Sequence, residues 1–512
     1  MTSPLSSFIQ PDDEQNRALL ARVHPSDWVN PEPAASYNLV VLGAGTAGLV
    51  TAAVASALGA KVALVEKVLM GGDCLNVGCV PSKGVLRAAR AWATVRDAGR
   101  FGVNVAADVR GDFSAAMTRM RRLRADISHN DSAQRFKELG VDVFFGEGRF
   151  VDRRSVEING TRLRFVKAAI CTGARAAIPP IPGLEEAGCL TNETVFTLTE
   201  LPPRLAVIGA GPIGCELAQA FARFGSRVTV LEQAAHALSR EEPDAAQLVQ
   251  AALERDGVQF AFRSTINKVD RRGNEKVLHV TAGGRMQELA VDAILVGAGR
   301  VPNVEGLGLE RVGVAFTAAG VTVNPLLQTS NPRIYAAGDV CSAEKFTHAA
   351  DAQAQIIIQN ALFPHPFGLG YATTSLLVIP RCTYTEPELA HVGLTEAEAQ
   401  RDGIAIQSYT VPLHEVDRAR LDGEEEGLVR LHVKKGSDAI VGAVIVASHA
   451  GELISQLSLV MRAGLGLSAI TSAIYPYPTQ AEAIKKAAQA WRKTLLTEGK
   501  KAILRKWFEW AR

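Results

Sequence analysis

This chain of 512 residues has no long apolar run, no large excess of either charge and few cysteines. No run of eighteen or more apolar residues occurs, so we expect no membrane-spanning helix. Lys and Arg number 55 and Asp and Glu 53, and the resulting net charge of +2 gives no field that predicts binding to nucleic acid. The first fourteen residues contain Asp12, Asp13 and Glu14 but no basic stretch, which argues against a secretory signal peptide.

The seven cysteines are few and odd in number, which argues against a secreted scaffold held together by disulfides. A reducing, cytoplasmic compartment is therefore expected, where a disulfide is more often catalytic than structural. Hydrophobic residues make up 47% of the chain and charged residues 21%, which is an ordinary globular composition able to bury several cores. At about 150 residues per domain, the length favours three to four domains.

Two segments repeat one pattern: a short apolar run, a G-x-G-x-x-G turn, an Ala-rich helical stretch, and a second β-branched run that ends in an acid. The turns consist of Gly43, Gly45 and Gly48 in the first copy and of Gly209, Gly211 and Gly214 in the second. The acids are Glu66 and Glu232, each 23 residues after the first glycine of its turn. This order of features predicts a βαβ dinucleotide-binding unit in each copy.

Each residue type in such a unit has a physical task. The first glycine makes the tight turn, the second lets the backbone approach a pyrophosphate, and the third lets the helix pack closely on the strand. The helix N-terminus offers free N–H groups to the phosphates, and the acid accepts hydrogen bonds from a ribose. One such turn alone is weak evidence, because any glycine-rich turn resembles it. Two copies in register indicate two dinucleotides, one bound permanently and one that exchanges.

A pair of cysteines follows the first unit, in the run Gly71–Lys83. In a regular helix, residues five apart lie about 8.6 Å apart at their Cα atoms, whereas a disulfide needs roughly 4.4–6.8 Å. If Cys74 and Cys79 bond, the chain before Cys79 must therefore depart from a helix, and Gly78 and Pro81 fit a helix that begins near Cys79. Buried free thiols or half of a zinc site are the alternatives, but no second CxxC or HxxxH pair is present. A redox-active disulfide is the favoured interpretation.

Taken together, these segments resemble the class I, FAD-dependent pyridine nucleotide-disulfide oxidoreductases, the group of dihydrolipoamide dehydrogenase, glutathione reductase and mercuric reductase. The resemblance runs from Tyr37 to about Trp491, and Gly71–Lys83 is its most specific part. The other matching segments are Cys171–Ala174, Gly297–Asn303, Tyr335–Asp339 and Phe346–His348. It implies an α/β fold with two doubly wound nucleotide-binding domains, for FAD and for NAD(P), a C-terminal α+β dimerisation domain, and a homodimer.

The expected domain boundaries follow from this resemblance and from the composition. They are an N-terminal extension over 1–36, an FAD-binding domain over 37–185 and 305–368, an NAD(P)-binding domain over 186–304, a dimerisation domain over 369–490 and a basic amphipathic tail over 491–512. Residues 87–140 are expected to form long helices whose arginines, Arg119, Arg121, Arg122 and Arg124, lie on a solvated face.

The family roles imply a set of catalytic residues. Cys74 would be the interchange thiol that attacks the substrate, and Cys79 the charge-transfer thiolate that faces the flavin. Lys83 would lie near the flavin and pair with Glu216. The remaining residues that would bind a cofactor, besides the two glycine turns and their acids, are Lys67, Gly72, Asp73, Thr172, Gly173, Gly299, Arg300, Gly338, Asp339 and Thr347.

Departures from the family pattern bear on the substrate. Members that act on thiols carry a His-Pro-Thr-x-x-Glu run, and here Tyr477 and Glu482 occupy the positions of its histidine and glutamate. Tyrosine is a poor base at neutral pH, and mercuric reductases also carry tyrosine there. Mercuric reductases, however, end in a vicinal cysteine pair that collects Hg(II), whereas the last cysteine here is Cys382. Only Cys74 and Cys79 would hold the metal transiently, and no structural metal site is expected.

The favoured function is therefore NAD(P)H-dependent reduction of Hg(II) or of a small disulfide by a mercuric reductase-like flavoenzyme. The alternatives are a dihydrolipoamide dehydrogenase-like enzyme, against which Tyr477 counts, and a flavoprotein redox sensor or membrane-associated scaffold with little turnover. Glu232 favours NADH, because a carboxylate repels the 2′-phosphate of NADPH. Arg240 and His236 lie close enough in sequence to leave NADPH open.

The C-terminal tail is expected to form an amphipathic helix. Ile503, Leu504, Trp507, Phe508 and Ala511 share one face of it, with basic neighbours at Lys500, Lys501, Arg505 and Lys506. A helix docked on the dimer that buries its tryptophans is the favoured interpretation, and weak contact with a membrane surface is the alternative.

Overall fold

The computed structural model describes residues 9–106 and 109–512, and the chain forms two compact units. Unit 1 contains the residues up to Ala210 together with Leu217–Gln233 and Val258–Leu377. Unit 2 contains Gly211–Glu216, Ala234–Gly257 and Val378–Arg512. Among the described residues, no helix combines the length and the apolar character that crossing a bilayer requires.

The first sheet of unit 1 has seven strands in the order β3-β2-β1-β6-β5-β4, with β18 also paired to β6. The strands are β1 (Tyr37–Leu42), β2 (Val62–Glu66), β3 (Asp142–Phe145), β4 (Gly148–Asp152), β5 (Ser155–Ile158), β6 (Thr161–Ile170) and β18 (Ile334–Ala336). The pairs among β3, β2, β1, β6 and β18 are parallel, whereas β4 and β5 extend the sheet in antiparallel fashion. β1 and β2 are almost wholly apolar and buried, as expected for central parallel strands.

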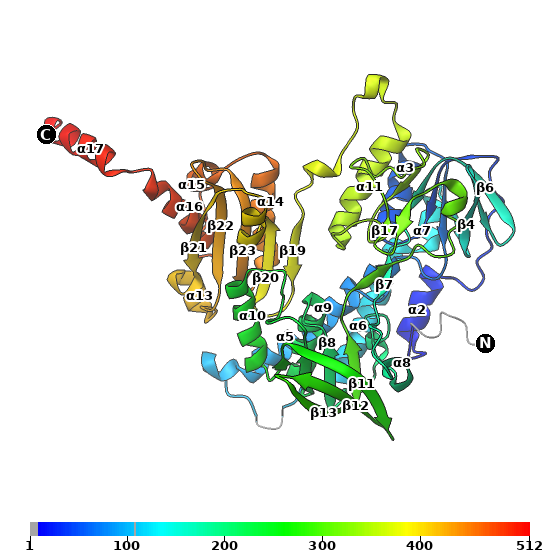
Figure 1. Ribbon diagram of the computed structural model, residues 1–512, viewed down its shortest axis with the longest axis horizontal. Coiled ribbons are helices and arrows are strands. Elements are labelled where there is room, and N and C mark those ends of the chain that lie inside the picture. The colour runs from blue at the N-terminus through cyan, green and yellow to red at the C-terminus, as the bar shows by residue number, and fades with distance from the viewer. Residues whose placement is uncertain (1–8, 107–108) are drawn as a thin grey trace. The chain divides into compact units, whose positions relative to one another are not determined.

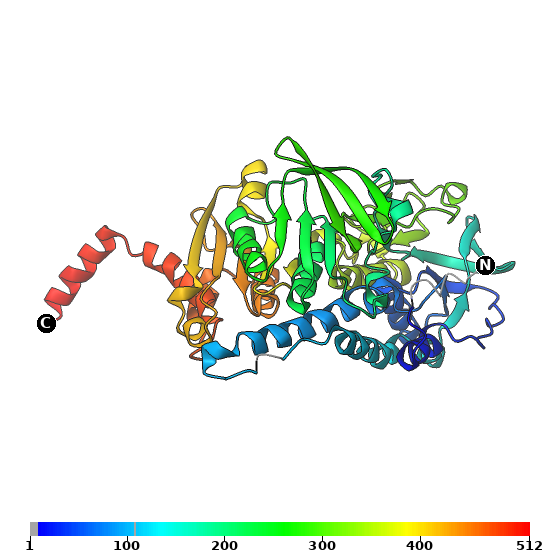
Figure 2. The same cartoon turned by 90° about the horizontal axis from the view of Figure 1, so that it is seen from below.

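The helices of this part of unit 1 pack on the sheet or on one another. They are α2 (Glu14–Val23), α3 (Thr46–Ala57), α4 (Gly72–Asn76), α5 (Cys79–Arg96), α6 (Phe113–Ile127), α7 (Ala133–Glu138) and α11 (Thr347–Leu362), with short 3-10 turns at η1 (Ala98–Phe101) and η2 (Ser128–Asp131). α3 and α11 lie side by side (Figure 1), and α5 is one uninterrupted helix of 18 residues (Figure 2).

Two of the four arginines expected on a solvated face are buried instead. Arg121 is 4% exposed and Arg124 is 1% exposed, because α2, from the N-terminal extension, lies against α6 and supplies partners for both. Arg121 pairs with Asp13 at 2.6 Å, and Arg124 donates to Asn16 Oδ1 at 2.7 Å. The prediction was wrong for these two residues because the sequence pattern of α6 does not show which segment covers it.

The second nucleotide-binding sheet has the order β10-β9-β8-β14, and all of its pairs are parallel. Its strands are β8 (Arg204–Ile208), β9 (Arg227–Leu231), β10 (Gln259–Ala261) and β14 (Ala293–Val296), with α9 (Pro212–Phe224) following β8. A three-stranded antiparallel sheet contains β11 (Ser264–Arg272), β12 (Glu275–Ala282) and β13 (Arg285–Val291).

Smaller elements complete unit 1. They are the antiparallel pairs β7 (Ala174–Ala176) with β15 (Arg300–Pro302) and β16 (Phe316–Thr317) with β17 (Gly320–Val321), the helix α8 (Leu184–Ala187), and the 3-10 turns η3 (Val195–Thr197), η4 (Glu310–Val312), η5 (Pro366–Gly368) and η6 (Thr374–Leu376).

Unit 2 is built on a five-stranded antiparallel sheet in the order β19-β20-β23-β22-β21. Its strands are β19 (Pro380–Thr383), β20 (Glu388–Gly393), β21 (Ile406–Pro412), β22 (Leu428–Lys434) and β23 (Ile440–Ala447). Its helices are α10 (Pro243–Arg255), α12 (Glu396–Arg401), α13 (Asp417–Asp422), α14 (Ala450–Arg462), α15 (Leu467–Ser472), α16 (Glu482–Thr494) and α17 (Glu498–Trp510), with one 3-10 turn at η7 (Leu413–Glu415). The core lies between the sheet and α14 to α16. The predicted fold class, two doubly wound domains and a C-terminal α+β domain, is confirmed.

Candidate active site

The two cysteines of the redox run lie on either side of a helix break. α4 ends at Asn76, Val77 and Gly78 leave helical geometry, and α5 begins at Cys79. A Cβ at position 78 would lie 2.8 Å from the carbonyl oxygen of Asp73, so only glycine fits there without a shift. The predicted departure from regular helix before Cys79 is confirmed. Both cysteines are present as thiols, so their disulfide stays a prediction.

The two thiols have opposite proton affinities. The hydrogen bond from Cys74, the Thr347 hydroxyl and the charge of Lys83 lower the pKa of Cys79 to about 6, against the effect of burial. The hydrogen bond to Cys79 and then burial raise the pKa of Cys74 above its usual range. Thr347 is the first residue of α11, and its Oγ1 lies 3.3 Å from the sulfur of Cys79. These shifts favour the thiolate on Cys79 and the protonated thiol on Cys74.

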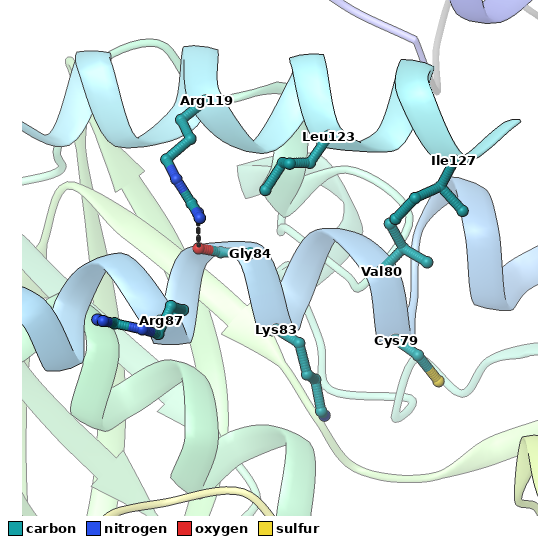
Figure 3. Close-up of a pocket in the computed structure, with 8 residues that line it drawn as sticks. All are labelled: Cys79, Val80, Lys83, Gly84, Arg87, Arg119, Leu123 and Ile127. Atoms are coloured by element: carbon teal, nitrogen blue, oxygen red, sulfur yellow. Dashed lines mark hydrogen bonds between the residues drawn. The ribbon is translucent and has the colours of Figure 1, made fainter.

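A cavity of about 350 Å³ opens beside Cys79, between α5 and α6 (Figure 3). Val80, Leu123 and Ile127 give it an apolar wall. Its other lining residues are Lys83, Gly84, Arg87 and Arg119. Arg119 reaches across from α6 to the carbonyl oxygen of Gly84, whereas Cys79 and Lys83 project from α5 one turn apart. The cavity thus gives a small molecule room beside the thiolate.

The first glycine turn has the geometry that its sequence predicts. Gly43 has φ of +100°, and a Cβ at Gly48 would lie 1.8 Å from the carbonyl oxygen of Gly43, so α3 starts too close to β1 for any side chain. Glu66, at the end of β2, accepts from the amides of Ala44 and Val68, both at 2.7 Å. Burial raises the pKa of this carboxyl. The turn therefore offers a cradle for a pyrophosphate and a carboxylate for a ribose.

Three charged residues link the redox run to the loop after β18. Arg300 lies 2.9 Å from a carboxylate oxygen of Asp73 and 3.1 Å from one of Asp339. Although burial alone would lower the pKa of Arg300, the two carboxylates raise it, so the guanidinium stays charged. Asn192 donates to Asp73 at 2.9 Å and to the carbonyl oxygen of Val77, which holds the run from its other side.

The other predicted cofactor residues occupy turns of the same unit. Gly173, Gly299 and Gly338 all have positive φ, and the amide of Gly338 donates to Gln353 Oε1 at 2.7 Å. Thr172 Oγ1 donates to the carbonyl oxygen of Asn303 at 2.7 Å. Gly72 approaches Gly45 so closely that a Cβ on Gly72 would lie 2.6 Å from the Cα of Gly45. Lys67 instead pairs with Glu147 at 2.7 Å on the surface.

The second glycine turn repeats the geometry of the first. Gly209 has φ of +101°, close to that of Gly43, and α9 begins after Gly211, with Gly214 in its first turn. Glu232 directly follows β9 and accepts from the amide of Ala210 at 2.7 Å, as Glu66 does from Ala44. The sequence position of Glu232 at the end of a strand is confirmed.

The remaining predicted catalytic residues lie in unit 2. Glu216 accepts from the amide of Tyr384 at 2.9 Å. Tyr477 is 71% exposed and donates to Asp417 at 3.0 Å, and this bond raises the pKa of the tyrosine. Glu482 is the first residue of α16. The pairing of Lys83 with Glu216 stays a prediction.

Unit 1 thus brings the cysteines, the first glycine turn, Asp73, Arg300 and Asp339 together around one region. The sequence did not predict the roles of Asn192, Gln353 and Arg124 at this site. Asn192 donates to Asp73, and Gln353 accepts from the amide of Gly338. Arg124 Nη1 donates at 2.6 Å to the carbonyl oxygen of Asn76, which lies between the two cysteines. Asn192 and Arg124 belong to no short motif, because their partners lie 48 to 119 residues away, whereas Gln353 bonds to Gly338 only 15 residues before it.

Comparison with known families gives two matches. Residues 37–355 match the family described as pyridine nucleotide-disulphide oxidoreductase, and residues 379–488 match its dimerisation domain. The match to the second family ends before α17 begins.

Curated relatives and solved structures agree with these matches. A mercuric reductase of Streptomyces lividans is 36% identical over 465 residues, covering 89% of this chain and 96% of the relative. A dihydrolipoyl dehydrogenase of Bacillus subtilis is 31% identical over 481 residues, covering 89% of this chain and 98% of the relative. The HOCl-induced flavoprotein disulfide reductase RclA from Escherichia coli is 28% identical, with a TM-score of 0.77, and the match covers 88% of this chain and 99% of that one.

Proposed function

Because the chain belongs to the family of FAD-dependent pyridine nucleotide-disulfide oxidoreductases, we propose that it reduces Hg(II) or a small disulfide through Cys74 and Cys79. One observation carries this proposal: the pKa of Cys79 is lowered to about 6 while that of Cys74 is raised. A thiolate that persists at neutral pH beside a protonated partner suits a site in which one sulfur faces a cofactor and the other attacks a substrate.

The residues around Cys79 fit FAD. The cradle at Gly43, Gly45 and Gly48 would hold its pyrophosphate, Glu66 a ribose and Asp339 the ribityl chain. FAD supplies the two-electron chemistry between a nicotinamide and a disulfide. Lys67, Gly72, Thr172, Gly173, Gly299, Gly338 and Thr347 complete the proposed FAD-binding set, together with Asp73 and Arg300.

In the proposed reaction Cys74 gives up its proton as it attacks a substrate sulfur, and the departing substrate thiolate takes that proton up; with a metal ion the proton is released to solvent as the sulfur binds. Cys79 holds the negative charge next to the flavin. Lys83, one turn along α5 from Cys79, stabilises that charge. Reduction of a disulfide takes two electrons and two protons, and reduction of Hg(II) to Hg(0) takes two electrons. NADH supplies both electrons as hydride in each case. A disulfide takes up one further proton from solvent, whereas reduction of Hg(II) releases the proton of the hydride.

Mercuric reductases of Staphylococcus aureus and Streptomyces lividans are 34% and 36% identical to this chain, which supports Hg(II) as a substrate. Soft Hg(II) is best held by two thiolates, and Cys74 and Cys79 provide a pair. The apolar-walled cavity of about 350 Å³ at Cys79 also admits a small disulfide.

Dihydrolipoamide is a second candidate, supported by the 31% identity to the Bacillus subtilis dihydrolipoyl dehydrogenase. Tyr477 counts against it, because its raised pKa leaves even less of the phenolate, the form that accepts a proton, at neutral pH. A histidine at position 477 would provide a base with a pKa near 6.5, so Tyr477→His should raise any dihydrolipoamide activity.

For the nucleotide we propose NADH, bound at Gly209, Gly211 and Gly214 with Glu232 at the adenosine ribose. NADPH stays the alternative, with Arg240 and His236 as the residues close in sequence that would serve its phosphate. The match to the dimerisation domain supports a homodimer. We further propose that Tyr477 and Glu482 of the partner complete each site, that Glu216 pairs with Lys83, and that the enzyme works in the cytoplasm.

The deciding experiment is a substrate screen with the FAD-loaded dimer. NADH oxidation is followed with Hg(II) in excess thiol, with lipoamide and with small disulfides, and NAD+ reduction is followed with dihydrolipoamide. The control is Cys74→Ser/Cys79→Ser with FAD bound. We expect turnover with Hg(II) or a disulfide that the double variant loses, while NADH still bleaches the flavin of both proteins. Turnover with none of these substrates, or equal turnover in the double variant, would overturn the proposal.

A further inference from the structure

The last helix of the chain, α17, stands apart from the part that matches the dimerisation domain. That match ends at residue 488, whereas α17 covers Glu498–Trp510. Thr497 caps the helix by accepting from the amide of Lys500, and none of the residues of α17 is buried. α17 is joined to α16 by a short link (Figure 2). It is thus a formed helix without a buried face of its own.

One side of α17 is apolar and faces solvent. Ile503, Trp507, Phe508 and Trp510 are between 57% and 76% exposed, and Leu504 is 40% exposed. At about 100° per residue, these five side chains and Ala511 fall within an arc of about 160°. Trp507 and Trp510 lie with ring centroids 5.1 Å apart. A continuous exposed surface of this kind indicates an interaction site.

The opposite side of α17 and its approach are strongly basic. From Trp491 to Arg512 seven Lys or Arg side chains stand against Glu498 and Glu509, which is a net charge of +5, whereas the whole chain has only +2. The preceding 490 residues therefore carry a net −3. Lys501 pairs with Glu498 at 2.8 Å, and Arg505 lies 3.8 Å from the same carboxylate. Positive charge is concentrated at one end of a chain that is otherwise slightly acidic.

We propose that α17 binds the surface of a bilayer that contains anionic lipids. The apolar arc would enter the boundary between headgroups and acyl chains, and Lys501, Arg505, Lys506 and Arg512 would lie among the headgroups. A helix of 13 residues is about 20 Å long, too short to cross the roughly 30 Å hydrocarbon core, so it lies along the surface.

Charge and composition favour lipid over a second copy of the helix. Pairing two α17 helices through their apolar faces would bring two segments of net charge +5 together, whereas an anionic surface attracts both. Trp507, Trp510 and Phe508 also belong to the types enriched where an apolar phase meets water, because an indole ring is apolar with one polar N–H.

The test uses the full-length FAD-loaded dimer and sedimentation with vesicles, either of phosphatidylcholine alone or of phosphatidylcholine mixed with phosphatidylglycerol. We expect binding only to the anionic vesicles, weakened by salt. Arg505→Gln/Lys506→Gln should weaken it about tenfold or more, and Trp507→Ala/Phe508→Ala should also weaken it. The matched control Lys434→Gln/Lys435→Gln removes two exposed charges outside the tail and should bind like the wild type.

Two outcomes would overturn the proposal. One is a wild-type protein that does not sediment with anionic vesicles, or that binds neutral vesicles equally well. The other is a lipid-free dimer in which an aqueous quencher does not reach the fluorescence contributed by Trp507, measured as the difference from Trp507→Phe. That result would mean that other parts of the protein already cover the apolar face of α17. If a chain truncated after Thr494 then no longer formed dimers, the covering surface would be the partner subunit. NADH oxidation without vesicles should be unchanged in all the tail variants, so a failure here leaves the proposed enzyme function untouched.

Discussion

Cys74 and Cys79 lie five positions apart, yet the pKa of the first thiol is raised and that of the second is lowered. One hydrogen bond causes both shifts. It runs from Cys74 to Cys79, so it stabilises the thiolate of Cys79, and it is lost if Cys74 ionises first. The break at Val77 and Gly78 allows the two sulfur atoms to come within hydrogen-bonding distance, since a continuous helix would keep the Cα atoms of the two residues about 8.6 Å apart.

The first prediction concerns this thiolate. Two-electron reduction should produce a long-wavelength charge-transfer band between Cys79 and FAD. A lowered pKa means that the thiolate is present above pH 6 and is protonated below it, so the band should fade as the pH drops through about 6. Cys74→Ser should show the band without reductant, because its serine cannot form a disulfide. Absorbance titration measures both. A flavin spectrum that neither Cys79→Ser nor Cys74→Ser alters would mean that the roles are wrongly assigned.

A second prediction concerns Glu232 and the choice of nucleotide. Loss of a charged hydrogen bond costs about 1.5–3 kcal/mol, or about one to two decades of affinity. Glu232→Ala should therefore weaken NADH by that factor and leave NADPH equal or improved. Because Glu232 also accepts from the amide of Ala210, Glu232→Gln is the matched control that keeps an acceptor and removes only the charge. Specificity constants for both nucleotides decide the matter. A wild type that strongly prefers NADPH would contradict the assignment and direct attention to Arg240.

At the scale of elements, α2 and α6 together support the redox run. Arg124, 1% exposed, joins Asn16 on α2 to the carbonyl oxygen of Asn76 between the cysteines. Burial lowers the pKa of this guanidinium to about 10, and the charge of Arg121 adds to that effect. The arginine nevertheless stays charged at neutral pH, so its hydrogen-bond partners are required.

Removing one of those partners gives a third prediction. Asn16→Ala leaves one Nη of a buried guanidinium unpaired and should lower the free energy of unfolding by about 1.5–3 kcal/mol. Arg122 lies on the same helix with its side chain 55% exposed, so Arg122→Ala should change it by less than about 0.5 kcal/mol. Urea unfolding of the FAD-loaded proteins compares them. Equal stability of the two variants would show that α2 does not hold Arg124 in solution.

A fourth prediction concerns the segment before α10 in unit 2. Glu242 lies 2.8 Å from the buried His432 and also pairs with Arg430, both on β22. Although burial would raise the pKa of Glu242, these partners lower it from 4.5 to about 2. Because the pKa of Glu242 is lower in the folded state than in the unfolded chain, its ionisation stabilises the folded state above pH 4.5. This contribution is lost as the pH falls towards 2. Stability in urea should therefore fall by about 2–3 kcal/mol across that range.

Glu242→Gln should flatten this acid-side slope, because the glutamine does not titrate. The exposed Glu452→Gln, in the same unit, is the matched control and should leave the slope as it is in the wild type. A slope that persists in Glu242→Gln would assign the acid sensitivity to other carboxylates.

Features set by a few neighbouring residues could be predicted from the sequence. Both glycine turns could be predicted because each needs a φ that favours glycine, +100° at Gly43 and +101° at Gly209. The break before Cys79 could be predicted because Gly78, where a Cβ would clash with the carbonyl oxygen of Asp73, lies between the two cysteines. The buried Arg124 and the role of Asn192 could not be found, because their partners Asn16 and Asp73 lie 108 and 119 residues away. Such contacts depend on how α2 and the loop after α8 pack, which no periodicity in the sequence encodes.

At the scale of the whole molecule, two chains are needed to form the sites that we propose. The cysteines lie in unit 1, and Tyr477 and Glu482 lie in unit 2 of the same chain. If the partner supplies the second pair, each of the two sites of the homodimer draws on both chains. Catalysis would then depend on the dimer, although Cys74, Thr347 and Lys83, which lower the pKa of Cys79, come from the same subunit as Cys79.

The fifth prediction tests this arrangement with heterodimers of differently tagged chains. One chain carries Cys74→Ser and the other Tyr477→Ala. If Tyr477 acts across the interface, both defects fall in the same site and the second site is intact, so turnover per FAD should be about half that of the wild type. If Tyr477 acts on the cysteines of its own chain, each site carries one defect and turnover should match the mean of the two mutant homodimers. Steady-state turnover with the substrate found in the screen distinguishes the two, because the total number of altered side chains is identical and only their distribution between sites differs.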